Sequence, residues 1–235
     1  MRKQIKLAAL AAAAGMVAAS AQAQQYNGDL LVGFASTTGG ATNALGNHLD
    51  FVYDLGAESS LTAGETWNLS SFLGGFTLSS VQWGVIGDNT TTHTVWSTTD
   101  GSVAPRNISG HTDLIQNIED PTETIYGNLA GTGAGDHNNS IDNTANNSWN
   151  METVSPGNSP TAYANTYGNP NVTGETSDYF YSLAGYNTSP SLAGNFSLDG
   201  SGTLTFNPVP EPSAIGLLTG AGLLMFALRN KFRRI

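Results

Sequence analysis

Histidine readily binds metals and transfers protons near neutral pH, so the histidines are the first residues to consider for chemistry. The chain has four of them, namely His48, His93, His111 and His137. No H-E-x-x-H or H-x-H spacing groups them as metal ligands. Ser201 stands between two glycines but lacks the G-x-S-x-G pattern of a serine hydrolase, and Asp199-Gly200 before it indicates a turn. We therefore assign no catalytic residue and predict a protein that is not an enzyme.

Carboxylates are the second group of chemically capable side chains. Of the 18 Asp and Glu residues, all but Glu211 lie between Gln24 and Pro208. Two facing carboxylates can hydrolyse a glycosidic bond, one as acid and the other as nucleophile or base. No spacing in this sequence requires any two of them to face each other. Solvated acidic residues are the simpler explanation, and a secreted hydrolase stays an alternative function.

Three aspartates are candidate ligands for a hard cation. Asp88 and Asp100 stand in polar loop sequences, and Asp136 ends the run 131–136, which matches one imperfect copy of a calcium-binding β-roll repeat. A single copy has no second turn on which to stack, and Asx turns account for aspartates in loops. We therefore predict no metal site and no cofactor. Calcium is the ion that these oxygen ligands would take.

Basic residues are almost absent from the middle of the chain. Of the 8 Lys and Arg residues, only Arg106 lies between Gln24 and Pro208, so this part carries a formal charge of −16. Affinity for nucleic acid needs clustered cations, which excludes nucleic acid as a partner. The chain also has no cysteine, so core burial must stabilise the fold without disulfides.

Alternating apolar and polar residues, bounded by Gly, Asn and Asp, predict strands between the two ends. The expected strands cover residues 28–36, 47–55, 77–87, 93–98, 178–186, 194–198 and 203–206. Residues 77–87 and 93–98 form one predicted hairpin, and residues 194–198 and 203–206 form another. The period of two in residues 47–55 predicts a half-buried strand.

The remaining segments predict short helices and loops. Helices are expected over residues 64–72, 112–117 and 122–129, and the Gly-, Asn- and Ser-rich residues 130–171 are expected to form helical turns or a long surface excursion. Taken together, residues 24–208 are predicted to form a mainly β, single β-sandwich-like domain with short helices and long polar loops.

Residues 1–23 have the three regions of a secretory signal peptide. A charged start with Arg2 and Lys3 precedes an apolar stretch over residues 7–19, and small residues follow at Ala21 and Ala23. We predict cleavage between Ala23 and Gln24, and hence export of the mature chain.

The last 27 residues, 209–235, divide into a motif, a helix and a basic tail. The motif comprises Val209, Pro210, Glu211, Pro212 and Ser213. Its prolines fix φ and keep the peptide out of regular structure. The uncharged residues 214–228 predict a transmembrane helix of roughly 22 Å, which flanking residues extend toward a hydrocarbon core of about 30 Å.

The tail, residues 229–235, carries a cluster of cations. They are Arg229, Lys231, Arg233 and Arg234. The positive-inside rule places such a cluster on the cytoplasmic side, where it would act as a stop-transfer signal.

This ending resembles the PEP-CTERM sorting signal of exported bacterial proteins. Pro210-Glu211-Pro212 matches the recognition motif, residues 214–228 match its membrane helix, and residues 229–234 match its basic cluster. The resemblance implies a partner, an exosortase-like membrane protease. It also implies that the helix holds the body outside the cytoplasm at the inner membrane until processing. The implied destination is the cell surface or an exopolysaccharide matrix.

These observations predict an exported cell-envelope or surface protein that is structural or adhesive in an exopolysaccharide matrix. Exopolysaccharide is the second partner expected, because aromatic residues and polar loops would contact carbohydrate. The alternatives are a carbohydrate- or calcium-binding module and a secreted hydrolase. Exposed Trp or Tyr beside loop carboxylates would favour binding, and two carboxylates converging in a deep cleft would favour hydrolysis.

Overall fold

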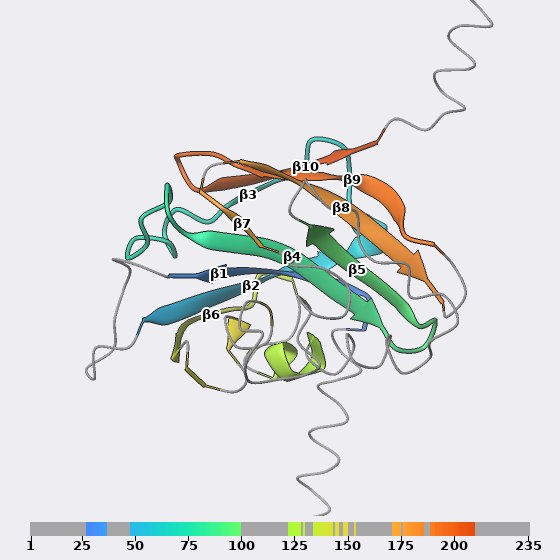
Figure 1. The fold of residues 1–235 in the computed structure, drawn as a ribbon, viewed down its shortest axis with the longest axis horizontal. Coiled ribbons are helices and arrows are strands. Elements are labelled where there is room, and N and C mark those ends of the chain that lie inside the picture. The colour runs from blue at the N-terminus through green and yellow to red at the C-terminus, as the bar shows by residue number, and fades with distance from the viewer. Residues whose placement is uncertain are drawn as a thin grey trace, which may run out of the picture.

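The computed structural model describes residues 27–36, 48–99, 122–127, 129, 134–142, 144–145, 148–149, 153, 171–174, 176–185 and 189–209 (Figure 1). The predicted signal peptide over residues 1–23, residues 210–235 and the expected helix over residues 112–117 lie outside these ranges. The elements are β1 (Asp29–Ala35), β2 (Leu49–Ala57), the short 3-10 helix η1 (Glu58–Ser60), β3 (Thr66–Asn68), β4 (Gln82–Asn89), β5 (Thr94–Thr99), β6 (His137–Asp142), β7 (Val172–Thr173), β8 (Ser177–Ala184), β9 (Ser191–Leu198) and β10 (Thr203–Pro208).

All ten described strands belong to one curled antiparallel sheet. Its order is β3-β10-β9-β8-β5-β4-β1-β2-β6, and β7 pairs with β4 off this path. In Figure 1 the strands β8, β9 and β10 lie above β1 and β2, and β5 joins the two layers through hydrogen bonds to both β4 and β8. The prediction of a mainly β protein is confirmed, and the two layers are parts of a single sheet.

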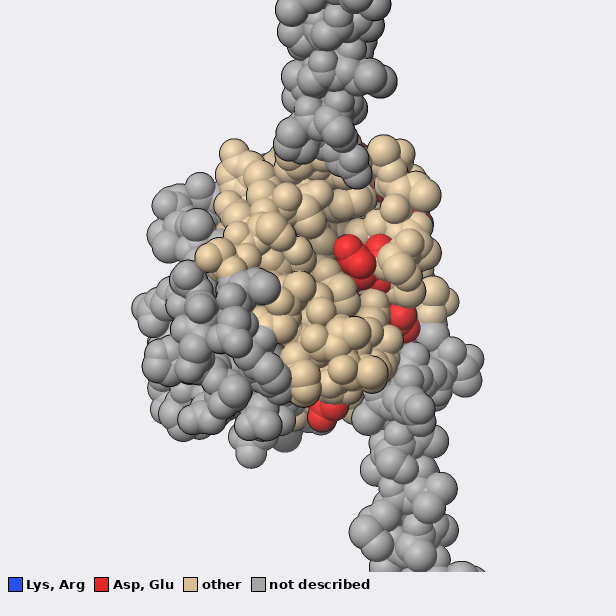
Figure 2. Space-filling model, turned by 90° about the vertical axis from the view of Figure 1, so that its right-hand side faces the viewer, with Lys and Arg blue, Asp and Glu red and all other residues tan. Residues whose placement is uncertain are grey.

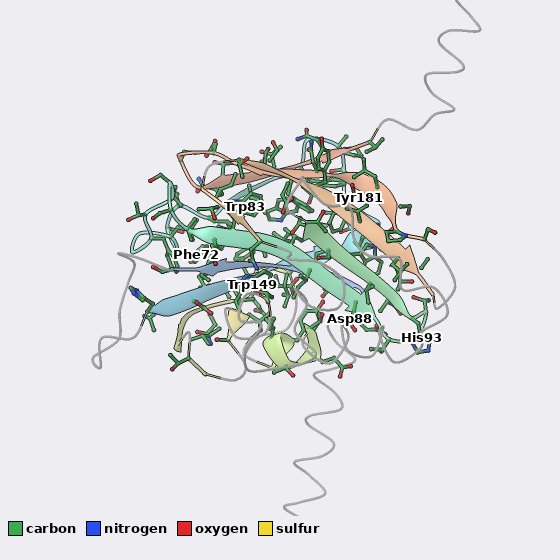
Figure 3. The ribbon with its side chains drawn as sticks, viewed as in Figure 1. Phe72, Trp83, Asp88, His93, Trp149 and Tyr181 are labelled. Atoms are coloured by element: carbon green, nitrogen blue, oxygen red, sulfur yellow. The ribbon has the colours of Figure 1, made fainter. Side chains whose placement is uncertain are left out.

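The larger core fills the inside of the curl. Its fully buried aromatic residues are Phe34, Phe51, Trp83, Phe180 and Phe196. The rings of Phe180 and Phe196 meet edge to face with centroids 5.1 Å apart. Figure 3 shows Trp83 between the two layers, where its indole N–H donates to the Gly174 carbonyl at 2.9 Å. Burying rings of this size is worth roughly 1.5–3 kcal/mol each, so this core dominates the stability.

A second core covers the outer face of β1, β2, β4 and β5. A helical segment over residues 122–126 packs there with Ile125 and Tyr126, as does Trp149 on the opposite side of β1 from Trp83 (Figure 3). Gly33 of β1 makes room for Trp149, because a Cβ on Gly33 would lie 1.9 Å from the indole ring. The central strands are therefore buried on both faces.

This double burial corrects the prediction of a half-buried strand over residues 47–55. In β2 the side chains of both Phe51 and Val52 are fully buried, and so are those of Asp50 and Asp54. The period of two correctly placed the residues on opposite faces. It did not show that a distant segment covers the second face.

One further prediction is wrong in this region. Residues 64–72 contain strand β3 and turns rather than a helix, because Thr66–Asn68 pairs with β10 from the far end of the chain. Within residues 130–171 the described residues Trp149 and Thr153 are helical, as expected, but His137–Asp142 forms strand β6, which pairs with β2. Both strands were missed for one reason, since pairing between distant segments leaves no local period.

Both predicted hairpins are confirmed, as β4–β5 and as β9–β10. The first begins at Gln82 instead of residue 77, because the N–H groups of Ser80 and Val81 bond back to the carbonyl of Thr77 and close a turn. The helix expected over residues 122–129 is confirmed for residues 122–126. Among the residues that the structure describes, none of the helices has the length and apolar character needed to cross a membrane.

Candidate functional site

The outer face of β8, β9 and β10 carries a polar surface beyond the second core. In β8 the side chains of Asp178 and Phe180 are buried, whereas Tyr179 between them is 46% exposed. Strand alternation therefore turns Tyr179 away from the larger core. On β9 the same alternation buries Phe196 and leaves Asn195 half-buried on the outer side.

Four residues on the outer side of the sheet stand directly opposite one another on four adjacent strands, and the first of them, Thr99, is buried. Thr99 of β5 pairs with Tyr179 of β8, Tyr179 pairs with Asn195 of β9, and Asn195 pairs with Asn207 of β10. Neighbouring strands are about 4.8 Å apart, so this row extends across roughly 15 Å of the sheet. We call these four residues the cross-strand row. They provide hydroxyl and amide groups with one aromatic ring and no formal charge.

A second uncharged set runs parallel to the cross-strand row. It pairs Ser177 of β8 with Ser197 of β9, Ser197 with Thr205 of β10, and Thr205 with Thr66 of β3. The residues that the structure describes include no Lys or Arg. On the side shown in Figure 2 the described surface is mostly uncharged with scattered acidic groups. Hydroxyls and amides thus line this part of the sheet without any cation to attract an anionic partner.

A pocket opens at the start of β8, at the centre of this surface. It has a volume of about 290 Å³, and its described lining residues are Ser177, Asp178, Tyr179 and Asn195. The Oδ1 atom of Asn195 is buried and has no hydrogen-bond partner. A buried carbonyl oxygen normally accepts a hydrogen bond, so this atom lacks its usual partner, and a turn of the Asn195 side chain would present it to a donor on a ligand. The ring of Tyr179 supplies an apolar wall with a polar tip.

Large apolar side chains are also exposed around β9. Leu192 of β9 is 40% exposed and pairs with Tyr181 of β8, and Val209 is 40% exposed with its N–H donating to the carbonyl of Ala193 at 3.1 Å. Together with Tyr179 they mix apolar contact area with hydrogen-bonding groups. This mixture suits a ligand that has both apolar faces and hydroxyls, such as a sugar.

The carboxylate with the most perturbed titration lies elsewhere, at the end of β2. The pKa of Asp54 is raised to about 7, chiefly by burial, with smaller contributions from the charges of Asp29 and Asp136. The N–H of Gly56 donates to its Oδ1 at 2.7 Å, which opposes this rise, and its buried Oδ2 has no partner. Burial also raises the pKa values of Asp29 and Glu58.

A raised carboxyl pKa is typical of catalytic acids, yet Asp54 is fully buried beneath its neighbours. Its backbone N–H and carbonyl are both bonded to the segment at residues 135–136. A polymer cannot contact its carboxylate in this arrangement. We therefore interpret Asp54 as a structural acid, and the observation does not favour hydrolysis.

The residues singled out as metal candidates do not form a site in the described structure. Asp88 is buried on β4, whereas Asp136 lies beside Asp54, and Asp100 falls outside the described residues. Within the described ranges, no three His, Asp or Glu residues are grouped so as to hold a metal ion.

The histidines are placed on separate elements. His48 precedes β2, and His93 lies in the β4–β5 turn with a φ of 51°. His137 on β6 packs against Phe72 with ring centroids 4.2 Å apart, while His111 is outside the described residues. Ser201 lies in the β9–β10 turn, where its N–H and hydroxyl donate to Asp199 Oδ1 at 2.9 and 2.6 Å.

Of the sorting motif, the structure describes Val209 alone. Pro210, Glu211, Pro212 and Ser213 lie outside the described residues, as do the basic cluster and the cleavage residues Ala21, Ala23 and Gln24. Val209 follows β10 directly, so the motif begins where the sheet ends.

Sequence reasoning missed the pocket residues Tyr179 and Asn195. The alternation in Asp178-Tyr179-Phe180-Tyr181 was a usable signal, because it separates two outward tyrosines from the buried phenylalanine. The order of the strands was not available from the sequence, so the neighbours of Tyr179 were not predictable.

Comparison with protein-family models, with curated proteins and with solved structures yields no match to this chain. The described residues define an acidic, mainly β protein with an uncharged polar surface on one side of its sheet.

Proposed function

We propose that this chain is an exported cell-surface protein, processed by an exosortase-like protease, that is structural or adhesive in an exopolysaccharide matrix. The sandwich-like domain and the transmembrane helix over residues 214–228 belong to this proposal. The single observation that carries the sorting part is the order of motif, apolar stretch and basic cluster in residues 209–235. The exposed position of Val209 after β10 supports it, because a protease would approach the motif at the edge of the body.

The polar outer face of β8–β10 supports the matrix-binding part. Polysaccharides present many hydroxyls and apolar ring faces, and the accessible part of the cross-strand row offers the ring of Tyr179 beside the amides of Asn195 and Asn207. The expected exposed aromatic residue is present as Tyr179, whereas its neighbour Asp178 is buried within β8 and is not a loop carboxylate. The protein acts as a binder without chemical turnover.

Replacing Pro210-Glu211-Pro212 by three alanines tests the sorting claim. We expect the variant to accumulate at its uncut size in the inner membrane, because the motif that the protease recognises is gone. Membrane fractionation with an antibody against the body measures this. Unchanged processing and surface delivery would show that the tail is only an anchor.

A matched control leaves the motif over residues 209–213 intact and alters the exposed residue before it. Pro208→Ala keeps the whole motif, so we expect wild-type processing. N-terminal sequencing of the exported protein should begin at Gln24, whereas a retained Met1 would contradict export by a cleaved signal peptide.

A further inference from the structure

The lining of the pocket at the start of β8 restricts the class of polysaccharide that could bind there. The Oδ1 atom of Asn195 is a buried acceptor without a partner, and an acceptor needs a ligand that donates. A hydroxyl or an ammonium group meets this condition, whereas a carboxylate does not. The first restriction on the ligand is therefore a donor group directed at Asn195.

Charge gives the second restriction. The segment from Gln24 to Pro208 has a formal charge of −16, and Asp178 lines the pocket itself. The described residues include no Lys or Arg that would pair with a carboxylate or sulfate on a sugar. Polyuronates and sulfated glycans would be repelled at long range and would find no ion-pair partner in the pocket.

Size and shape give the third restriction. A volume of about 290 Å³ lies at the lower limit of ligand pockets, which are roughly 300–1,000 Å³, and suits one sugar ring rather than a folded oligosaccharide. The cross-strand row continues from the pocket toward β10 through Asn195 and Asn207. A chain of sugars held at one ring can thus extend along hydroxyl-binding groups.

We propose that this pocket binds one ring of a neutral, hydroxyl-rich polysaccharide, with Tyr179 stacking on the sugar and Asn195 Oδ1 accepting a sugar hydroxyl. The inference rests on the proposed matrix function and specifies its ligand. Binding requires no calcium, because the pocket relies on an aromatic face and an amide. It is also insensitive to salt, because no ion pair contributes.

The test is a pull-down of the full chain, in mild detergent, on beads of four polymers. Cross-linked dextran and an insoluble β-1,3-glucan are neutral, cross-linked alginate is anionic, and chitosan is cationic. We expect binding to at least one neutral polymer, unchanged by EDTA and by about 0.5 M NaCl, at which screening acts within roughly 4 Å. Alginate should not retain the protein.

Variants locate the binding on the surface. Tyr179→Ala and Asn195→Leu should each weaken binding to the neutral polymer at least tenfold, whereas Tyr179→Phe should retain it because the stacking ring remains. Thr92→Ala, at an exposed position in the β4–β5 turn, is the control and should bind like the wild type. Thermal unfolding of every variant checks that the fold is intact.

Several results would overturn the inference. These are retention on alginate, retention on chitosan alone that salt abolishes, loss of binding in EDTA, and failure of both neutral polymers to bind. If neutral polymers bind but the Tyr179 and Asn195 variants bind equally well, the binding site lies elsewhere on the protein, and the proposed matrix function stands. If the pocket variants fail to bind while the Pro210-Glu211-Pro212 variant still reaches the surface, the proposed binding site is supported and the proposed sorting signal is wrong.

Discussion

Asp54→Asn should stabilise the protein at high pH and leave it nearly unchanged at low pH. Asp54 is fully buried, and its pKa is raised from 3.8 to about 7. In the folded state the carboxyl therefore keeps its proton over a pH range in which the unfolded chain has lost it. Stability linked to this group is fully present below pH 3.8 and is lost as the pH rises through about 7. An asparagine stays neutral throughout and removes this loss.

The size of the effect follows from the shift. Each pKa unit corresponds to about 1.4 kcal/mol, so a shift of about three units has an upper limit of about 4 kcal/mol. Screening by nearby solvent reduces this, and we expect about 2 kcal/mol at pH 8. For a domain of this size, 1 kcal/mol changes Tm by roughly 2–4 °C, which gives an increase of roughly 4–8 °C.

Thermal unfolding followed by tryptophan fluorescence at pH 4 and pH 8 measures this difference. The buried Trp83 and Trp149 report on both cores. In the Asp54→Asn variant the side-chain amide oxygen still accepts from the N–H of Gly56, so the turn after β2 is preserved. If Tm changes by the same amount from pH 4 to pH 8 in the wild type and in the variant, the raised pKa of Asp54 is refuted.

Two other substitutions probe the turn after β9 and the second core. The pKa of Asp199 is lowered, mainly by the hydrogen bond from the Ser201 hydroxyl, so its contribution to stability is lost as the pH falls through this depressed value. Asp199→Asn should therefore lower Tm more at pH 7 than at acid pH, and an equal loss under both conditions would contradict this sign. Gly33→Ala would place a methyl group 1.9 Å from the Trp149 ring, and it should cost about 3 kcal/mol or more, measured by urea unfolding. Gly74→Ala meets nothing within 4 Å and should be nearly neutral; a comparable loss there would show that backbone freedom, and not the indole, is the cause.

The sequence predicted those parts of the fold in which the decisive contacts are local. In the β9–β10 hairpin, Phe196 and Leu198 alternate with polar residues and Asp199-Gly200 closes the turn, so pattern and turn chemistry agree. The β4–β5 hairpin was found for the same reason. Both depend on residues that are close in the chain.

The missed parts depend on distant partners. Trp67 lies on β3 because Thr66–Asn68 pairs with β10, and its own neighbourhood resembles an amphipathic helix. Asp50 and Asp54 seemed solvent-facing from their polarity, but the second core, with Ile125, Tyr126 and Trp149, covers that face of the sheet. The candidate pocket has the same origin, since Tyr179 and Asn195 become neighbours only when β8 and β9 pair.

The position of β10 has a mechanical consequence for a protein held by its tail. β10 lies between β9 and β3, with Leu204 to Pro208 paired to β9 and Thr203 to Thr205 paired to β3. A pulling force that enters through Val209 runs along the strand axis and loads these hydrogen bonds in shear, all at once, instead of opening them one after another. Forced unfolding is governed by the unfolding rate, and a strand clamped on both sides makes that step slow. If the C-terminal segment anchors the body as proposed, the body would withstand drag from flowing water or from a swelling matrix.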